Sequence, residues 1–201
     1  MHEYNRPKAS YRAEIEILKS RFIATVFPAN SVEEAKLRLA DTRREMPTAN
    51  HHVYAFVVGF GSSVIEGLSD DGEPTGTAGQ PVMAVLRGTQ LGDTLIIVTR
   101  YFGGTLLGTG GLVRAYTEAA QAALAGVEIE RKVERRQVML VIPYSAYQRI
   151  SRLLREHEVI MLEEDFGSDV TLLIEIPVAS IDIIERAVAD TCAGKAEFVR
   201  S

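Results

Sequence analysis

The stretch from Thr94 to Tyr116 reads TLIIVTRYFGGTLLGTGGLVRAY. Its first part, Thr94–Thr99, has a run of apolar residues, which predicts a strand buried on both faces. Five glycines follow between Gly103 and Gly111 and predict a loop. Helix-favouring sequence then runs from Leu112 to Ala125, and Gly126 is a typical residue to end a helix. The stretch therefore predicts a strand, a glycine-rich loop and a helix in succession.

The residues before this stretch predict further strands, one helix and a second loop. The strands are expected at residues 11–18, 22–27 and 53–58, with a weaker one near 64–68, and the loop at residues 69–81. Ser31 and Glu34 have the spacing of a capping box, which predicts a helix from there to about Arg44. Ala35 and Leu39, with Leu37, are expected to face inward.

The residues after about 132 change in order. They predict strand, helix, strand, strand, helix and strand at residues 137–142, 146–157, 159–163, 170–176, 181–191 and 197–200. Ser145 and Gln148 form a second capping-box spacing, and Ser180 is a candidate N-cap. The βαββαβ order is typical of a ferredoxin-like domain. We therefore expect an α+β protein with two domains, at residues 1–132 and 133–201.

The composition limits the possible functions. The chain of 201 residues carries 22 Lys and Arg against 27 Asp and Glu, a net charge of -5, which excludes a generally basic nucleic-acid coating protein. Residues 133–201 hold 8 basic and 12 acidic side chains, so a nucleic-acid contact is expected from a local patch in residues 1–132. Cys192 is the single cysteine, and the apolar runs are shorter than a membrane span. We expect a cytoplasmic protein without membrane contact.

The glycine-rich loop before the second predicted helix is a candidate anion site. Backbone N–H groups at a helix start attract anions, and Gly108, Gly110 and Gly111 would let a phosphate approach the backbone. Arg100 and Arg114 flank the loop and suit phosphate. The same glycines could instead serve a tight turn and close helix packing. The P-loop lysine and the third glycine of the dinucleotide fingerprint are both missing from this loop.

A second candidate site combines carboxylates and histidines. Asp70, Asp71 and Glu73 could bind a divalent cation, although an aspartate that caps a turn is the favoured interpretation. His51 and His52 are neighbours on a predicted strand and point to opposite faces, so they are not expected to share a metal. One of them could join the carboxylates in a hydrolytic site if the fold brings them together.

Two strings of residues resemble signatures of the IMPACT/YigZ family. They run from Ser69 to Pro81, as SDDGEPxGTAGxP, and from Arg100 to Tyr116, as RYFGGxxLGxGGLxRAY. Lys19–Ile23 and the His51-His52 pair also resemble residues of that family. The resemblance implies a ribosomal-protein-type α/β fold for the first domain. It implies a ferredoxin-like second domain similar to the last domain of elongation factor G, and a role related to translation.

Three functional hypotheses follow. The first is a non-enzymatic protein that contacts RNA or the ribosome, with a translation-associated protein as another possible partner; it assigns no catalytic residue, metal or cofactor. Its contact residues are Arg21, Arg100, Tyr101, Gly103, Gly104, Gly108, Gly110, Gly111 and Arg114. Tyr101 and Phe102 could stack on bases or belong to the core. The second hypothesis is a metal-assisted hydrolase or peptidase at the histidines and carboxylates. The third is a module that binds a nucleotide, a phosphate or a protein.

Overall fold

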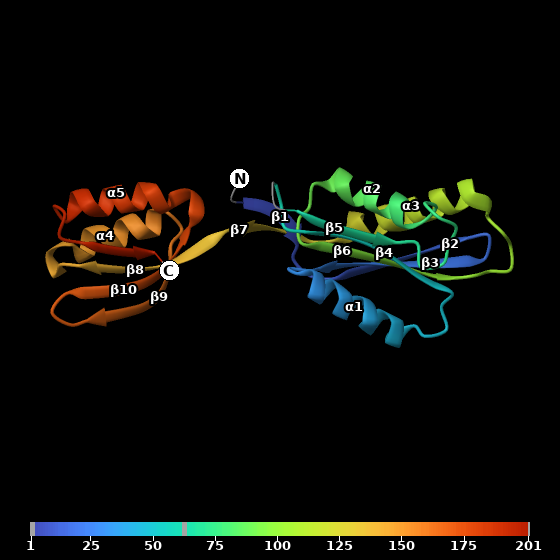
Figure 1. Cartoon of the computed structure of the whole chain (residues 1–201), viewed down its shortest axis with the longest axis horizontal. Coiled ribbons are helices and arrows are strands. Elements are labelled where there is room, and N and C mark those ends of the chain that lie inside the picture. The colour runs from blue at the N-terminus through green and yellow to red at the C-terminus, as the bar shows by residue number, and fades with distance from the viewer. Residues whose placement is uncertain (1–2, 62–63, 201) are drawn as a thin grey trace. The chain divides into compact units, whose positions relative to one another are not determined.

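A computed structural model describes residues 3–61 and 64–200 of the chain. The chain divides into two compact units (Figure 1). The first unit runs from Tyr4 to Lys132, and the second holds the described residues from Val133 onward together with Glu3. Both units combine helices with antiparallel sheet, so the chain has the two-unit α+β architecture that the sequence predicts.

A five-stranded antiparallel sheet forms the centre of the first unit. Its order is β2-β3-β6-β4-β5, with bounds β2 (Tyr11–Ile17), β3 (Ser20–Pro28), β4 (His51–Val58), β5 (Ile65–Ser69) and β6 (Thr94–Tyr101). The middle strand β6 is buried from Thr94 to Arg100. Burial on both faces is what its apolar sequence predicts.

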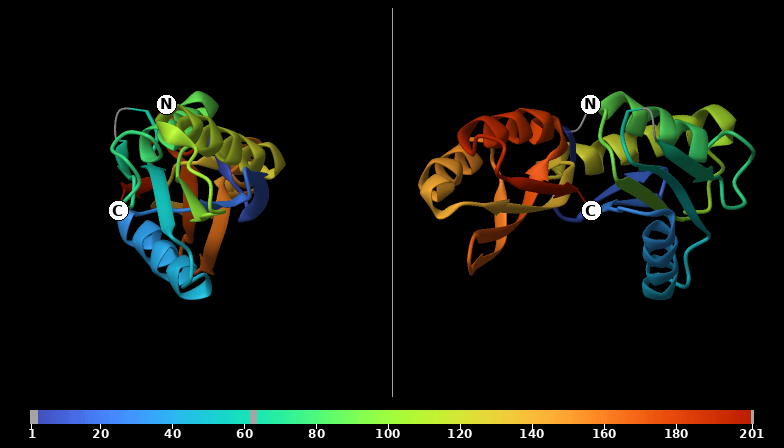
Figure 2. Two further views of the ribbon diagram at one scale, coloured as in Figure 1. Left: turned by 90° about the vertical axis from the view of Figure 1, so that its right-hand side faces the viewer. Right: turned by 60° about the vertical axis from the view of Figure 1, so that its left-hand side comes forward.

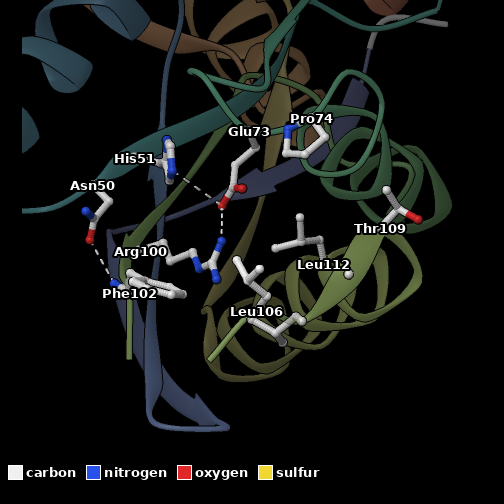
Figure 3. A pocket seen from close by; sticks show the side chains of 11 residues that line it. Asn50, His51, Glu73, Pro74, Arg100, Phe102, Leu106, Thr109 and Leu112 are labelled. Carbon is white, nitrogen blue, oxygen red and sulfur yellow. Dashed lines mark hydrogen bonds and ion pairs between the residues drawn. The ribbon is translucent and has the colours of Figure 1, made fainter. Parts of the chain in front are cut away.

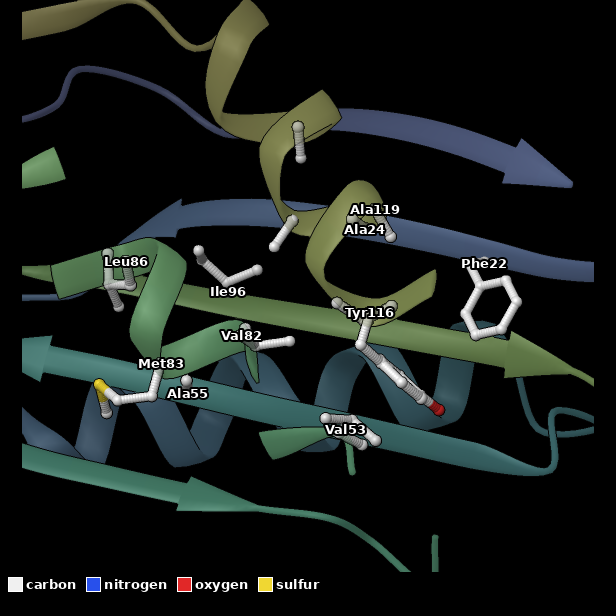
Figure 4. Packing of buried hydrophobic residues seen from close by; sticks show 14 of the residues in the cluster. Phe22, Ala24, Val53, Ala55, Val82, Met83, Leu86, Ile96, Tyr116 and Ala119 are labelled. Atoms are coloured by element: carbon white, nitrogen blue, oxygen red, sulfur yellow. The ribbon is translucent and has the colours of Figure 1, made fainter. Parts of the chain in front are cut away.

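Helices cover both faces of this sheet (Figure 2). Helices α2 (Gly79–Thr89) and α3 (Gly108–Gly126) lie on one face, and α1 (Val32–Glu45) lies on the other. The larger core forms beneath α2 and α3, where Met83 and Leu86 of α2 and Tyr116 of α3 are fully buried (Figure 4). Side chains of this size each contribute roughly 1.5–3 kcal/mol through burial. The sheet and helices thereby hold the start of α3 at a fixed place.

The second unit has a four-stranded antiparallel sheet and two helices. The sheet order is β11-β8-β10-β9, with bounds β8 (Arg135–Ile142), β9 (Ile160–Phe166), β10 (Val170–Pro177) and β11 (Glu197–Arg200). Helix α4 (Tyr144–Glu156), the short η1 (Val178–Ser180) and α5 (Ile181–Thr191) complete it. The apolar alternation of β8 and β10 meets the helices in one core. This arrangement is the ferredoxin-like βαββαβ pattern.

Several local predictions were wrong. Helix α3 begins at Gly108 rather than Leu112, so the last glycines of the predicted loop form its first turn. Leu37 is 66% exposed because it lies on the outer face of α1. Ser145 lies inside α4, whose N-cap is Pro143. Ser180, by contrast, is the N-cap of α5 as predicted, although its side chain makes no capping hydrogen bond.

Two short strands were missed altogether. β1 (Glu3–Pro7) and β7 (Ile129–Val133) pair in a separate two-stranded sheet. Arg6 donates from Nε to Glu130 Oε1 at 2.7 Å, across 124 residues of sequence. Neither strand has an apolar pattern strong enough to predict it from the sequence. Each pairs with a partner at the far end of the unit's sequence.

No helix in the part of the chain that the structure describes is long and apolar enough to cross a membrane.

Candidate functional site

The register of three strands sets a row of side chains across the sheet. Arg100 of β6 is paired with Phe22 of β3 on one side and with His51 of β4 on the other. Residues that are directly opposite in an antiparallel pair share a face of the sheet. Phe22 packs edge-to-face on Tyr116 of α3, with ring centroids 5.2 Å apart. Arg100 and His51 therefore lie on the face that α3 covers.

A buried ion pair forms at this row. Arg100 donates from Nη1 to Glu73 Oε1 at 2.6 Å, and Tyr116 donates from its hydroxyl to the same oxygen at 2.7 Å. The side chains of Arg100 and Glu73 are only 6% and 3% exposed. Burial, together with the hydrogen bond to Glu73, raises the pKa of Tyr116 far above its ordinary value. The phenol therefore stays protonated and remains a donor.

Arg100 has a different environment from the one that the sequence suggests. We expected its guanidinium at an exposed anion contact, but the pairing of β6 with β3 and β4 places it beneath α3, where Glu73 neutralises it. Its Nε is buried and has no hydrogen-bond partner among the described residues. A buried donor without an acceptor costs about 1–3 kcal/mol. The described residues therefore provide no acceptor for the Nε–H group of Arg100.

The two histidines of β4 point to opposite faces, as their alternation predicts. His51 Nδ1 donates to the carbonyl oxygen of Asp71 at 2.8 Å, and its Nε2 lies 3.9 Å from Glu73 Oε1. His52 instead contacts Thr99 Oγ1 at 3.1 Å on the other face. Burial lowers the pKa of His52, which favours its neutral form.

A pocket of about 470 Å³ opens above the ion pair (Figure 3). Its walls come from the two loops that the sequence singled out, together with the ends of β4 and β6 and the start of α3. They are formed by Asn50, His51, Glu73, Pro74, Arg100, Phe102, Leu106, Leu107, Gly108, Thr109 and Leu112. The two glycine-rich segments therefore meet at one site, which the sequence could not establish.

The N-terminus of α3 is open to this pocket. Ser31 caps α1 by accepting from the backbone N–H of Glu34, whereas the N-cap of α3, Leu107, has no side-chain hydrogen bond. A Cβ added at Gly110 would meet nothing within 4 Å, so close packing does not require a glycine there. Glycine inside a helix costs about 1 kcal/mol relative to alanine. Packing therefore does not account for Gly110 in the first turn.

Asp70 organises the first of the two loops. Its carboxylate accepts hydrogen bonds from the backbone N–H groups of Gly76, Ala78 and Gly79 at 2.9, 3.1 and 2.8 Å. It thereby caps the start of α2, in agreement with the favoured interpretation of this acidic cluster. Burial alone would raise the pKa of Asp70, but the three backbone donors outweigh it and lower the pKa below its ordinary value.

We expect Asp70→Ala to lower the free energy of unfolding of the first unit by about 1–2 kcal/mol at pH 7, because the start of α2 loses its cap. The lowered pKa means that the contribution of Asp70 is present above about pH 4 and is lost as the pH falls through the folded-state pKa. Urea unfolding of both proteins from pH 7 to pH 2.5 measures this. The two stabilities should converge in acid. A constant difference at every pH would contradict the role given to the carboxylate.

The remaining predicted residues lie outside the pocket walls. Asp71 accepts from the backbone N–H of His52 at 2.7 Å and pairs with Arg43 at 2.6 Å. Arg21 is exposed, pairs with Glu14 at 2.6 Å, and lies 5.5 Å from the ring centroid of Tyr101.

Gly103 packs against the turn before β3, and a Cβ at Gly104 would meet nothing within 4 Å. Arg114 is exposed on α3, two residues after Leu112 of the pocket wall. The described residues contain no group of three His, Cys, Asp or Glu side chains that could hold a metal ion. The fold does bring His51 to 3.9 Å from the Glu73 carboxylate, but these two side chains have no third such residue beside them among the described residues.

Two members of the site were missed from the sequence. Tyr116 supplies a buried donor to Glu73, and Asn50 Oδ1 accepts from the backbone N–H of Phe102 at 2.8 Å. Tyr116 ends the second family-like string, which was the one available signal for it. Asn50 precedes the two histidines and had no signal of its own.

Comparisons with known proteins match nearly the full chain. A family model described as the Impact N-terminal domain matches residues 18–124, and one described as a domain of unknown function (DUF1949) matches residues 140–195. An IMPACT family member of Haemophilus influenzae is 39% identical, over 97% of this chain and 95% of that protein. The IMPACT family member YigZ of Escherichia coli is 36% identical, over 99% and 98%. A crystal structure of a hypothetical protein, also 36% identical, superposes with a TM-score of 0.73 over 99% of this chain and 97% of that one.

Proposed function

The chain belongs to the IMPACT family, and from that premise we propose that it is a non-enzymatic, cytoplasmic protein of translation that contacts RNA or the ribosome. The contact surface is the pocket at the start of α3. The observation that carries this proposal is the start of α3, where Leu107, Gly108 and Thr109 line the pocket and the N-cap Leu107 makes no side-chain capping hydrogen bond.

A phosphate suits the start of α3. The first N–H groups of a helix point out of its N-terminus, and the helix dipole adds a partial positive charge there. The pocket below is closed by the Arg100–Glu73 pair, whose opposite charges cancel. An approaching phosphate therefore meets the helix end without a large opposing charge.

An RNA base fits against the neighbouring wall of the pocket, at Phe102. The ring of Phe102 is 45% exposed, and the guanidinium of Arg100 lies 5.7 Å from its centroid. Exposed aromatic rings stack on bases in single-stranded nucleic acid sites, at about 1–3 kcal/mol per base. Leu106 and Leu112 add apolar surface to the same pocket.

Co-sedimentation with ribosomes and with total RNA, at low and moderate salt, tests the proposal. We expect pelleting at low salt that weakens as salt rises, because phosphate contacts release counterions. Arg114→Ala should lower the salt slope by about 1, and Phe102→Ala should weaken binding at every salt concentration. Arg186→Ala, an exposed arginine of the second unit, is the matched control and should bind as the unmodified protein does.

Pelleting that is absent at low salt, or unchanged in both variants, would contradict the proposal. A thermal shift with free nucleotide in the absence of RNA binding would favour the nucleotide-binding module instead. Co-migration with a protein partner that survives ribonuclease would favour the protein-binding alternative.

A further inference from the structure

Only one of the two oxygens of the Glu73 carboxylate accepts hydrogen bonds from the described residues. Oε1 accepts two hydrogen bonds, from Arg100 and Tyr116, which fill its two lone pairs. Oε2 accepts no hydrogen bond from any described residue, although the side chain is 97% buried, and Glu73 lines the pocket. Figure 3 places this carboxylate at the pocket wall. An unfilled acceptor therefore faces the ligand space.

His51 adds a second acceptor beside it. His51 Nδ1 donates to the carbonyl oxygen of Asp71, which leaves Nε2 as the ring atom that can accept a hydrogen bond from a ligand, and Nε2 lies 3.9 Å from Oε1 of the Glu73 carboxylate. Two acceptors this close repel any ligand group that presents an acceptor of its own. The ligand group that fits here carries N–H donors at neighbouring positions.

We propose, on the basis of the RNA contact argued above, that the pocket selects guanine. The Watson–Crick edge of guanine carries two adjacent donors, N1–H and the N2 amino group. Adenine and cytosine place a ring nitrogen acceptor next to their amino group, and uracil flanks its one N–H with two carbonyl oxygens. Guanine is thus the one RNA base that brings paired donors to Glu73 Oε2 and His51 Nε2.

The rest of the pocket has room for the remainder of a guanosine nucleotide. Its volume of about 470 Å³ is within the range for ligand pockets of small molecules. Phe102 offers a ring for the base, and the first turn of α3 at Gly108 and Thr109 offers N–H groups for the phosphate.

Fluorescence anisotropy with two labelled pentaribonucleotides, AAGAA and AAAAA, tests the selection. We expect the protein to bind AAGAA at least about tenfold more tightly, because a good paired contact to a base edge discriminates by about that factor or more. Glu73→Gln, which replaces one acceptor by a donor, should remove the preference. Glu118→Gln, an exposed carboxylate of α3, is the matched control and should retain it.

A second variant keeps the test independent of the stability of Glu73→Gln. Phe102→Ala should weaken both oligonucleotides by a similar factor and leave the preference in place, since it removes stacking and leaves both acceptors. Equal, salt-sensitive binding of the two oligonucleotides by the unmodified protein would overturn the guanine inference and leave the RNA contact standing. Absence of binding to both, together with absence of ribosome pelleting, would overturn the proposed function itself.

Discussion

Glu73→Ala is expected to lower the free energy of unfolding of the first unit by about 3–5 kcal/mol, because it leaves the charge of Arg100 buried and unpaired. The Arg100 side chain is only 6% exposed and lies beneath α3, so its charge is largely removed from water. The Tyr116 hydroxyl loses its acceptor as well. Urea unfolding followed by circular dichroism measures the loss.

A double-mutant cycle separates the ion pair from simple loss of packing. We expect Glu73→Leu with Arg100→Met to be more stable than either single variant, because no buried charge then remains unpaired. Arg152→Ala with Glu156→Ala, an exposed pair within α4, is the matched comparison and should lose about 0.5 kcal/mol or less. Single losses at Glu73 and Arg100 that simply add in the double variant would contradict the coupling.

The second unit was the part of the fold best predicted from the sequence. Residues 170–177 of β10 alternate between buried and partly exposed positions, and α4 and α5 carry apolar residues at helical spacing. Each element there can be recognised from its own hydrophobic periodicity, because one of its faces is buried and the other is exposed to solvent. The βαββαβ order then leaves few topologies to choose from.

The start of α3 was misplaced because its determinant is not local. The glycines have low helix propensity and no capping residue precedes them, so the sequence predicts a loop. Leu112 and Tyr116 nevertheless pack the helix against the sheet, and the helix begins at Gly108. Tertiary packing overrides propensity here. The glycines in the first turn of α3 are unfavourable for a helix, and this turn lies at the pocket. Conflicts between local sequence preference and structure are expected at functional sites.

The candidate site could be located by its loops but not assembled. The sequence indicated Arg100, His51 and Glu73 separately, because each residue type has recognisable chemistry. Their meeting depends on the register that sets His51 opposite Arg100, and on a loop that returns Glu73 beneath α3. The register of a strand depends on which of its faces is buried. A single sequence does not show which strands and loops, far apart along the chain, will lie next to one another.

Gly103→Ala is expected to destabilise the first unit by about 1–3 kcal/mol or more, because the new methyl group has no space. A Cβ at this position would lie 2.0 Å from the carbonyl carbon of Lys19 and 2.3 Å from the backbone nitrogen of Ser20. Both contacts are backbone atoms of a turn in which Leu18 and Lys19 have positive φ, so a side-chain rotation cannot relieve them. The segment after Gly103 must move away from β3, and with it the pocket wall at Leu106.

Gly104→Asn separates this clash from the ordinary cost of replacing a glycine. Gly104 has a φ of +87° and open space around its Cβ position, and asparagine tolerates positive φ better than other residues. We therefore expect Gly104→Asn to lower the melting temperature less than Gly103→Ala, and to retain the RNA binding that we propose for the pocket. Differential scanning calorimetry and the anisotropy assay measure the two effects. Equal melting temperatures of the two variants would mean that the segment after β6 adapts to the clash, and that the close approach of Gly103 to the Lys19–Ser20 turn does not hold the pocket wall in place.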